Sequence, residues 1–343
     1  MPDSLSLALK LNIYGQPVET PFDVFLGLAR DAEETGFSGV YVVDHLYLPR
    51  DRYVGYTWSD PSKPYFLDAW SVLAALAATT RRVRLGPQVS PLTFRHPALL
   101  ARAATTVDLI SNGRLVLQLG TGWHAEEHTA FGLEFPPAIE TRVERLTEGI
   151  EVIRGLMTSP GSYSFEGRHF HLVDAPFWPK PVQRPAVPIW LGGSTPRSQQ
   201  LVAELGDGWT PAMPQGRGMG VAPYAAAIGS IRERAEALGR DAGRIEFGLV
   251  VTTSIDEDRN RAAERAEVLL RRPDYAGLSP TDLAAMGALV WGTPEDCFEA
   301  LRDYVEAGAR TLTLNFVPFG DASAARRGME LYASRVLPRL VDL

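Results

Sequence analysis

The amino-acid sequence predicts an α/β protein built as one closed (β/α)8 barrel, the TIM-barrel architecture, with a hairpin insertion between units four and five. Three observations lead to this prediction. Short apolar runs alternate with longer helical patterns, eight such runs can be counted, and no linker rich in Pro, Gly and Ser divides the 343 residues. Near-continuous apolar strands indicate a parallel sheet buried on both faces, and eight such units fit a closed barrel. An open doubly wound sheet with a second domain is the alternative.

The first unit illustrates how the elements are recognised. Residues 5–13 form an apolar run of strand length, and a helix is expected between Thr20, which can cap it, and Gly36, which can end it. Pro21 suits the first helical position. Further strands are expected at 37–45, 82–90, 114–120, 187–193, 208–213, 244–255 and 310–318. Further helices are expected near 68–79, 97–110, 140–157, 195–206, 223–238, 256–272, 293–308 and 324–336.

The segment at about 158–187 interrupts this alternation between the fourth and fifth units. It contains "SYSFEGRHFHLVD", which is typical of a β-hairpin, and then a Pro-rich run. We therefore expect an insertion within a single domain that spans residues 1–343. The aromatic residues of the insertion could form a substrate lid or a subunit contact, or could simply pack beneath it.

The composition limits the classes of function. The net charge is −7, which gives no sign of a nucleic-acid or anionic-membrane partner. No segment approaches the roughly 20 apolar residues of a membrane helix, and the N-terminal residues lack a signal-peptide pattern, so we expect a cytoplasmic protein. The single cysteine, Cys297, excludes an internal disulfide and most cysteine-based metal sites, and its helical surroundings indicate packing.

In such a barrel the chemistry belongs at the carboxyl ends of the strands. Asp44 and His45 follow the second strand, where a carboxylate could orient an imidazole for proton transfer. A pair of surface residues is the alternative, and the barrel prediction favours the functional interpretation.

The fifth strand is followed by "GGST" at residues 192–195. Its two glycines allow close approach of a backbone, and amides at a helix start bind phosphate well. We therefore favour a phosphate site here, with a tight turn and a helix cap at Thr195 as the alternative.

The stretch "LGTGWHAEEH" at residues 119–128 follows the fourth strand and allows three interpretations. The spacing G-x-G-x-x-A resembles a dinucleotide-binding turn, but that fingerprint belongs to the first unit of its fold and three units precede this one. The spacing H-x-x-E-H resembles a reversed zinc-protease motif, but it follows a glycine turn and would need a further ligand from a later helix. We expect no metal, and a loop that serves the site of the whole barrel.

Several segments together carry a resemblance to a known family. They are "VYVVDHL", "LGPQVSPLTFRHPALLARAATTVDLISNGRLVLQLGTGWHAEEHTAFG", "RLTEGIEVIRGLM", "PKPVQRPAVPIWLGGSTPRSQQLVAELGDGWTP" and "VWGTPEDC". In their order and spacing the chain resembles the bacterial luciferase-like monooxygenases. That family includes flavin-dependent monooxygenases and oxidoreductases that use the deazaflavin coenzyme F420. The resemblance implies a (β/α)8 barrel with an insertion, and a homodimer.

The resemblance also implies roles for individual residues. In the F420-dependent branch, His45 would be the catalytic group and Asp44 would lie beside the cofactor. A non-proline cis peptide would join Gln88 and Val89 and bulge behind the ring. Trp123 would stand at the position of an acid–base residue. The other residues expected at the ring, its side chain and its phosphate are Gly120, Gly122, His124, His128, Gly192, Gly193, Ser194 and Thr195.

The chain departs from the family's sugar-phosphate dehydrogenase. Pro49 stands where that enzyme has a tryptophan shortly after its catalytic histidine, and Trp123 stands where it has a glutamate that acts as general acid. A phosphate-clamping lysine pair is not expected either, since Lys10, Lys63 and Lys180 are the only lysines. We therefore expect a neutral or apolar small-molecule substrate.

Two cofactors stay open at this point. Coenzyme F420 transfers hydride, whereas reduced FMN reacts with oxygen and would need a separate reductase as partner. The "DH" pair and the Arg-rich, Lys-poor composition favour F420. The prediction is thus hydride transfer between F420 and a small organic substrate, with His45 exchanging a proton. A two-component FMNH2-dependent monooxygenase is the alternative, and a non-catalytic flavin-binding relative is a third hypothesis.

Overall fold

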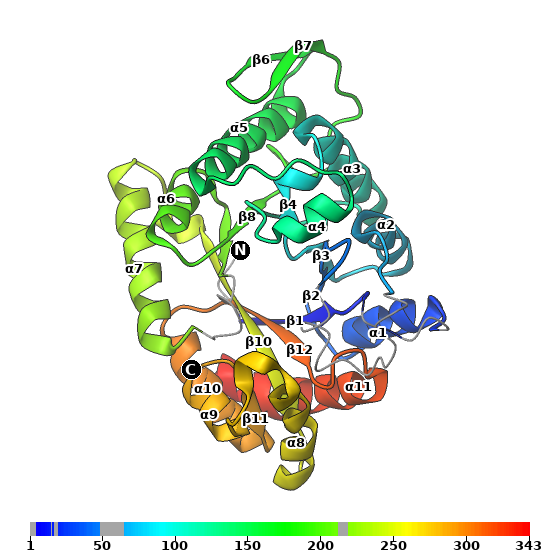
Figure 1. The fold of residues 1–343 in the computed structure, drawn as a ribbon, viewed down its shortest axis with the longest axis vertical. Coiled ribbons are helices and arrows are strands. Elements are labelled where there is room, and N and C mark those ends of the chain that lie inside the picture. The colour runs from blue at the N-terminus through cyan, green and yellow to red at the C-terminus, as the bar shows by residue number, and fades with distance from the viewer. Residues whose placement is uncertain (1–4, 15, 17–19, 49–64, 212–218) are drawn as a thin grey trace.

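The computed structural model describes residues 5–14, 16, 20–48, 65–211 and 219–343. A parallel, barrel-shaped sheet lies at the centre, with helices around its outside (Figure 1). The barrel prediction is confirmed, and each expected strand is present. The strands are β1 (Ser6–Leu11), β2 (Gly39–Val42), β3 (Arg84–Pro87), β4 (Ser90–Pro91), β5 (Leu117–Gly120), β8 (Ile189–Gly192), β9 (Gly208–Thr210), β10 (Glu246–Ile255) and β12 (Thr311–Phe316).

The helices that cover this sheet lie where the helical patterns predicted them, except that α12 continues the last helix beyond its predicted end near residue 336. The cap expected at Thr195 is present at the start of α6. The cap expected at Thr20 is wrong: α1 begins at Asp23, after Phe22 in helical backbone, and has no side-chain cap, so that Pro21 lies before its first residue. The helices are α1 (Asp23–Glu34), α2 (Ala69–Thr79), α3 (Pro97–Ser111), α5 (Ile139–Thr158), α6 (Pro196–Leu205), α7 (Val221–Ala237), α8 (Arg259–Ala266), α10 (Pro294–Glu306), α11 (Ala322–Leu331) and α12 (Leu337–Val341).

The sheet closes at the third strand position, which β3 and β4 share. β3 pairs with β2 on one side, and its Leu85 forms a parallel bridge with Leu115 on the other. β4 then pairs with β5, with Ser90 opposite Leu119. The two halves of this position therefore join the β2 side of the sheet to the β5 side, which makes the sheet a closed barrel.

The two faces of the strands bury different side chains. The leucines of β1 belong to the large core between sheet and helices. On the opposite face of β1, Ala8 packs inside the barrel against Tyr41, Val116 and Trp190. This interior apolar layer fills the barrel, so that a cofactor or substrate can enter only above it, at the carboxyl ends of the strands.

The insertion forms the expected hairpin, from β6 (Tyr163–Glu166) and β7 (His171–Ala175). It projects beyond α5 at the edge of the molecule in Figure 1. Glu148 of α5 accepts backbone hydrogen bonds from the hairpin turn, including that of His169 at 2.8 Å. Phe177 is buried, whereas Trp178 is 62% exposed. Part of the aromatic content of the insertion therefore serves ordinary packing.

Three elements were not predicted from the sequence. The short helix α4 (Ala125–Ala130) follows β5, in the stretch expected to be a loop. α9 (Pro280–Ala285) and β11 (Val290–Gly292) lie between the last two barrel strands. β11 pairs with the carboxyl half of the long strand β10, which extends far enough to offer a free edge. Elements of three to six residues carry too few apolar positions to establish a periodicity.

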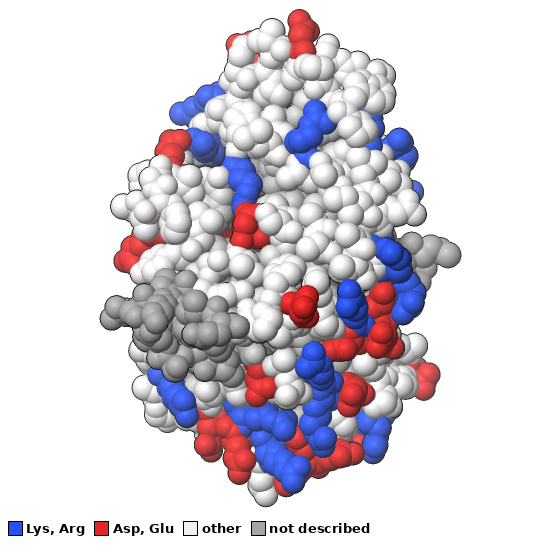
Figure 2. Space-filling view, turned by 90° about the vertical axis from the view of Figure 1, so that its right-hand side faces the viewer, with Lys and Arg blue, Asp and Glu red and all other residues white. Residues whose placement is uncertain are grey.

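The single cysteine is buried, and charged side chains are unevenly distributed over one face of the molecule (Figure 2). Cys297 is fully buried in α10, as its helical context indicated, and burial raises the pKa of its thiol to about 12. On the face drawn in Figure 2, basic and acidic side chains are mixed over the lower part and sparse over the upper part. Among the described residues, no helix is both long and apolar enough to cross a membrane.

Candidate active site at the barrel mouth

A histidine–carboxylate pair joins the ends of two strands. His45 follows β2, and its Nδ1 atom lies 3.0 Å from Oε2 of Glu127 on α4. The Glu127 side chain is 1% exposed and that of His45 14% exposed. Because a carboxylate only accepts hydrogen bonds, Nδ1 is the donor and Nε2 is the nitrogen left for another partner.

The backbone after β2 holds Glu127 in place. Its Oε1 atom accepts hydrogen bonds from the amides of Leu46, at 2.5 Å, and Tyr47, at 3.1 Å. Burial alone would raise the pKa of Glu127, but the hydrogen bond and charge of His45 and the two amides outweigh it and lower that pKa. Glu127 is therefore ionised at neutral pH and fixes the orientation of the imidazole.

The structure corrects the expected role of Asp44. Its carboxylate was predicted to orient His45, but it accepts hydrogen bonds from Ser90 and from both terminal nitrogens of Arg95, the longer at 3.1 Å. Successive residues of an extended chain point to opposite sides, so that neighbours in sequence are directed apart. Asp44 is 2% exposed and ties the end of β2 to the segment that follows β4.

The peptide bond between Gln88 and Val89 is cis, as the resemblance implied. The side chain of Val89 then lies between two glycines from neighbouring strands. A Cβ atom on Gly120 would come within 2.9 Å of Val89, and one on Gly192 within 3.4 Å. The glycine at 120 therefore makes room for this valine, which accounts for its place at the end of β5.

Aromatic rings surround the pair of His45 and Glu127. Trp123 meets His45 edge to face, with ring centroids 5.8 Å apart, and is 57% exposed. His124 stacks between Trp123 and Tyr47, at 4.9 and 6.0 Å. Burial lowers the pKa of His124, and its Nε2 atom is buried without a hydrogen-bond partner in the described part of the chain. The loop after β5 thus presents aromatic surface next to His45.

His128 lies deeper in the same loop. Its Nδ1 donates to the carbonyl of His124 at 2.7 Å, and its Nε2 lies 2.7 Å from the hydroxyl of Thr93. Gly122, with a φ of 75°, lets the chain pass next to Thr93, whose Oγ1 a Cβ atom would approach to 2.7 Å. Both ring nitrogens of His128 therefore have protein partners, and this residue holds the loop in shape.

The segment after β8 has the expected cap of a helix. Thr195 and Ser198 form a reciprocal capping box at the start of α6. Gly193 adopts a φ of 101°, and its carbonyl accepts a hydrogen bond from the indole of Trp209 at 2.8 Å. The cap occupies the hydroxyl of Thr195, whereas Ser194 and the backbone of the two glycines stay on the partly exposed rim.

These contacts bring most of the predicted residues to one rim. The ring of His45 contacts that of Trp123, and Asp44, next to His45 in sequence, accepts a hydrogen bond from Ser90. Val89, next to Ser90, contacts both Gly120 and Gly192. Pro49, named above as a departure from a relative, lies outside the described residues. The described residues contain no cluster of three or more metal-binding side chains.

Two neighbours of the predicted site residues do not follow from the sequence pattern. Glu127 enters the sequence analysis only through the zinc-like spacing, although a carboxylate three residues after a histidine at a strand end is also a candidate partner for another strand's histidine. Nothing in "TFRHP" marks Arg95 as the partner of a residue 51 positions away.

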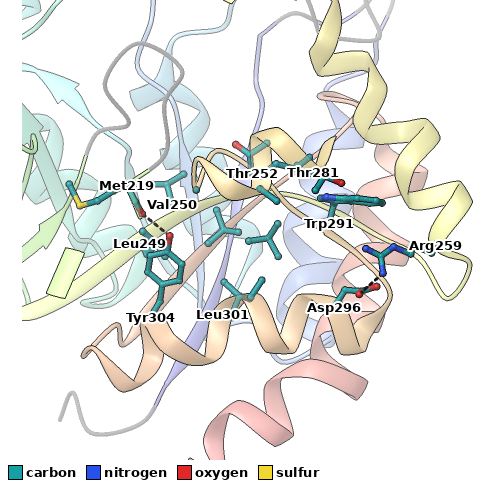
Figure 3. A pocket seen from close by; sticks show the side chains of 16 residues that line it. Met219, Leu249, Val250, Thr252, Arg259, Thr281, Trp291, Asp296, Leu301 and Tyr304 are labelled. Carbon is teal, nitrogen blue, oxygen red and sulfur yellow. Dashed lines mark hydrogen bonds and ion pairs between the residues drawn. The ribbon is translucent and has the colours of Figure 1, made fainter. Parts of the chain in front are cut away.

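Two hollows lie near the barrel. A cavity of about 240 Å³ opens between β10, β11 and α10, with the Arg259–Asp296 ion pair at one end and Tyr304 at the other (Figure 3). None of the site residues predicted from the sequence lines it. A shallow hollow lined by Tyr47, Ala125, Glu126, Thr129 and Ala130 lies beside α4, next to the aromatic rings described above.

Known proteins resemble this chain over most of its length. The sequence model of the luciferase-like monooxygenase family matches residues 10–311. An F420-dependent glucose-6-phosphate dehydrogenase of Amycolatopsis mediterranei is 30% identical over 330 residues, which cover 90% of this chain and 92% of that protein.

Solved structures share the fold. Monooxygenase RslO1 from Streptomyces bottropensis superimposes with a TM-score of 0.79 at 26% identity, covering 98% of this chain and 99% of that one. An F420-dependent secondary alcohol dehydrogenase, solved with an F420–acetone adduct, superimposes with a TM-score of 0.76 at 20% identity over 98% and 99% of the two chains. The chain therefore belongs to the luciferase-like monooxygenase family and is an oxidoreductase of that family.

Proposed function

We propose that this oxidoreductase transfers a hydride between coenzyme F420 and a small organic substrate. The observation that carries the proposal is the imidazole of His45, fixed by an ionised, buried Glu127 at the same rim as Val89, whose side chain packs against Gly120 and Gly192. Curated relatives at about 30% identity are F420-dependent dehydrogenases, which supports the choice of cofactor.

The residues at the rim fit a flat ring with polar edges. The Val89 side chain, enclosed by Gly120 and Gly192, offers an apolar surface against which a ring can rest. Below it, Oε1 of Gln88 and both amide atoms of Gln118 are buried without partners among the described residues. Buried amides are rarely left unpaired, so a polar ligand edge suits this place.

The chain's own residues have distinct tasks in this proposal. When bound, the deazaflavin ring supplies the chemistry of giving or accepting a hydride. His45 exchanges a proton with the substrate through Nε2, because Nδ1 is committed to Glu127. Trp123 forms the exposed wall of the substrate space next to the imidazole of His45.

The remaining site residues position the cofactor. Asp44 joins the end of β2 to Arg95 and Ser90, so its contribution is to hold the rim rather than to move a proton. The aromatic loop with His124 would line the ring's edge, and His128 would keep that loop in shape. Ser194 and the amides of Gly192, Gly193 and Thr195 would receive the cofactor phosphate at the start of α6.

The substrate in this proposal is neutral or apolar. The wall next to His45 is the indole of Trp123, whereas a charged sugar phosphate would call for basic side chains there. Lys63 lies outside the described residues, and Lys180 lies on the insertion, where its ammonium donates to the carbonyl of Leu156 at 2.7 Å. The sugar-phosphate activity in the names of the relatives is therefore not carried over to this chain.

A two-component FMNH2-dependent monooxygenase is the second candidate. It is favoured by the superposition on monooxygenase RslO1 from Streptomyces bottropensis, at 26% identity. In that case a separate flavin reductase would be the partner. A homodimer stays a prediction for either function, and light scattering on the eluting protein tests it.

The experiment is an anaerobic turnover assay of the purified protein with F420 and a panel of neutral alcohols and carbonyl compounds. The His45→Ala variant should lose roughly 10²- to 10⁴-fold in turnover. His171→Ala is the control, because that histidine is 56% exposed on the hairpin and should leave turnover unchanged. Full turnover by His45→Ala would contradict the proposed role, and turnover only with reduced FMN and oxygen would favour the second candidate.

A further inference from the structure

A layer of polar side chains lies inside the barrel, above the interior apolar layer. On β1 the inward positions alternate, so that Lys10 follows Ala8 on the same face. By the same alternation Gln118 follows Val116 on β5. We call this set the interior polar layer, and it comprises Lys10, Gln88, Gln118, Thr210 and Thr313.

Lys10 is the charged member of this layer. Its ammonium makes no hydrogen bond or ion pair within the part of the chain that the structure describes. Burial lowers its pKa to about 8, and no neighbouring carboxylate contributes to that shift. The side chain of Lys10 is half-buried, its ammonium is still largely protonated at neutral pH, and a charge held partly out of water without a partner is costly.

The neutral members of the layer are also short of partners. Gln88 donates to Thr313 at 3.3 Å, but its Oε1 is buried and unpaired. The side chain of Gln118 is fully buried with neither amide atom paired, and Oγ1 of Thr210 is unpaired as well. Native proteins leave few buried polar atoms unpaired, so several of them on inward-facing strand positions, in the same barrel interior as the Lys10 side chain, indicate a bound polar group.

The layer offers a particular pattern of donors and acceptors. Lys10 and Nε2 of Gln118 donate, and the side-chain oxygens of Gln88 and Gln118 accept. The pyrimidinedione edge shared by flavins and deazaflavins carries two carbonyls on either side of an N–H group, which is the complementary pattern. Two-electron reduction places negative charge on this same edge, where an ammonium is favourable.

We propose that the interior polar layer binds the pyrimidinedione edge of the ring, and that Lys10 is the positive charge that favours its reduced form. The inference rests on the proposed function only in requiring a flavin or deazaflavin at the barrel mouth; it holds for either cofactor. It adds Lys10 and Thr210 to the cofactor contacts.

The test compares how tightly the cofactor-free full-length protein binds the oxidised and the reduced cofactor. Wild type, Lys10→Met and Lys180→Met are titrated anaerobically with F420 and with FMN in both redox states, followed by fluorescence. Lys10→Met should weaken binding of the reduced form at least about tenfold more than the oxidised form. For a two-electron couple, that ratio corresponds to a potential about 30 mV lower for the bound cofactor. Lys180→Met should behave as wild type.

The outcomes separate this inference from the proposed function. If wild type binds neither cofactor, the proposed function fails and the inference fails with it. If wild type binds a cofactor and Lys10→Met has an unchanged ratio between redox states, only the inference is overturned. The apo form of Lys10→Met should unfold at the wild-type temperature or above, because the unpaired ammonium costs stability. A variant that unfolds earlier, or fails to fold, would show that Lys10 supports the barrel itself and would also overturn the inference.

Discussion

Nδ1 of His45 lies 3.0 Å from the carboxylate of Glu127, so that a residue after β2 and a residue on α4 act as one unit. The carboxylate also accepts hydrogen bonds from the backbone amides of Leu46 and Tyr47. It therefore sets both the orientation of the imidazole and the path of the chain after β2. The proposed proton exchange therefore depends on a residue that does not itself meet the substrate.

Replacing Glu127 tests this positioning role. Glu127→Gln keeps the size of the side chain but removes the charge, and its amide cannot accept all the hydrogen bonds that the carboxylate accepts. We expect turnover to fall at least about tenfold while KM changes little, because the loss concerns proton exchange. Glu126→Gln, one position earlier and exposed, is the control and should match wild type. Equal turnover of the two variants would exclude the role.

The same residue predicts how stability depends on pH. The pKa of Glu127 in the folded protein is lowered from its ordinary value of 4.5, so the folded state favours the ionised form. This contribution is complete above pH 4.5 and is lost as the pH falls through the lowered folded pKa. Urea unfolding of wild type should therefore show a steeper loss of stability below pH 4.5 than Glu127→Gln. Parallel curves for the two proteins would contradict it.

The pair of Asp44 and Arg95 predicts a difference between a buried and an exposed carboxylate. Arg95 bonds both Asp44, which is 2% exposed, and Asp68, which is 49% exposed. Asp44→Asn removes the negative charge that pairs with the partly buried guanidinium of Arg95. The free energy of unfolding should therefore fall by about 3 kcal/mol or more. Asp68→Asn keeps its helix cap and should cost under about 1 kcal/mol. Denaturant titrations measure both; similar losses would mean that burial is not the deciding factor.

The contact between Gly120 and the side chain of Val89 predicts a steric effect. A Cβ at this position would lie 2.9 Å from Val89, although the backbone of Gly120 is not left-handed and would accept alanine. Gly120→Ala should therefore cost about 1–3 kcal/mol and weaken cofactor binding. Adding Val89→Ala should restore much of both. Gly229→Ala, in α7 with open space around it, is the control and should be neutral or slightly stabilising. A Gly120→Ala variant as stable as the control would refute the contact.

Lys10, like Glu127, predicts stability that rises with pH, but in an alkaline window. Its folded pKa of about 8 lies below the ordinary 10.5, so the unfolded chain binds the extra proton between these values. Wild-type stability should then rise with pH between about 8 and 10.5. The rise should be about 1–3 kcal/mol relative to Lys10→Met. Tyr41, opposite Lys10 on β2, has a pKa raised to about 12 by burial and stays neutral in this window. If the difference in stability between wild type and Lys10→Met did not change between about pH 8 and 10.5, the lowered pKa of Lys10 would be contradicted.

The barrel could be predicted from the sequence because its signals are local. Apolar runs such as 244–255 and caps such as Thr293 depend on neighbouring residues, and they fixed each strand and most helices. The short elements α4, α9 and β11 escaped because a single turn or three strand residues have no periodicity of their own.

The candidate site could be predicted less completely, because it depends on contacts between strands. The rim positions of His45 and Val89 follow from strand ends and from the family resemblance. The partner of His45 does not, since Asp44 is adjacent in sequence whereas Glu127 is 82 residues away. Nothing in the pattern around Lys10 revealed that its ammonium lies inside the barrel without a partner.

The most direct test of the account is a fluorescence titration of the purified wild-type protein with F420 and, separately, with FMN. The rim around His45 and Val89 predicts saturable binding of F420, at lower concentrations than FMN. His45→Ala should still bind F420 while losing turnover. Absence of saturable binding by both cofactors would contradict the central claim that this rim holds a deazaflavin or flavin ring.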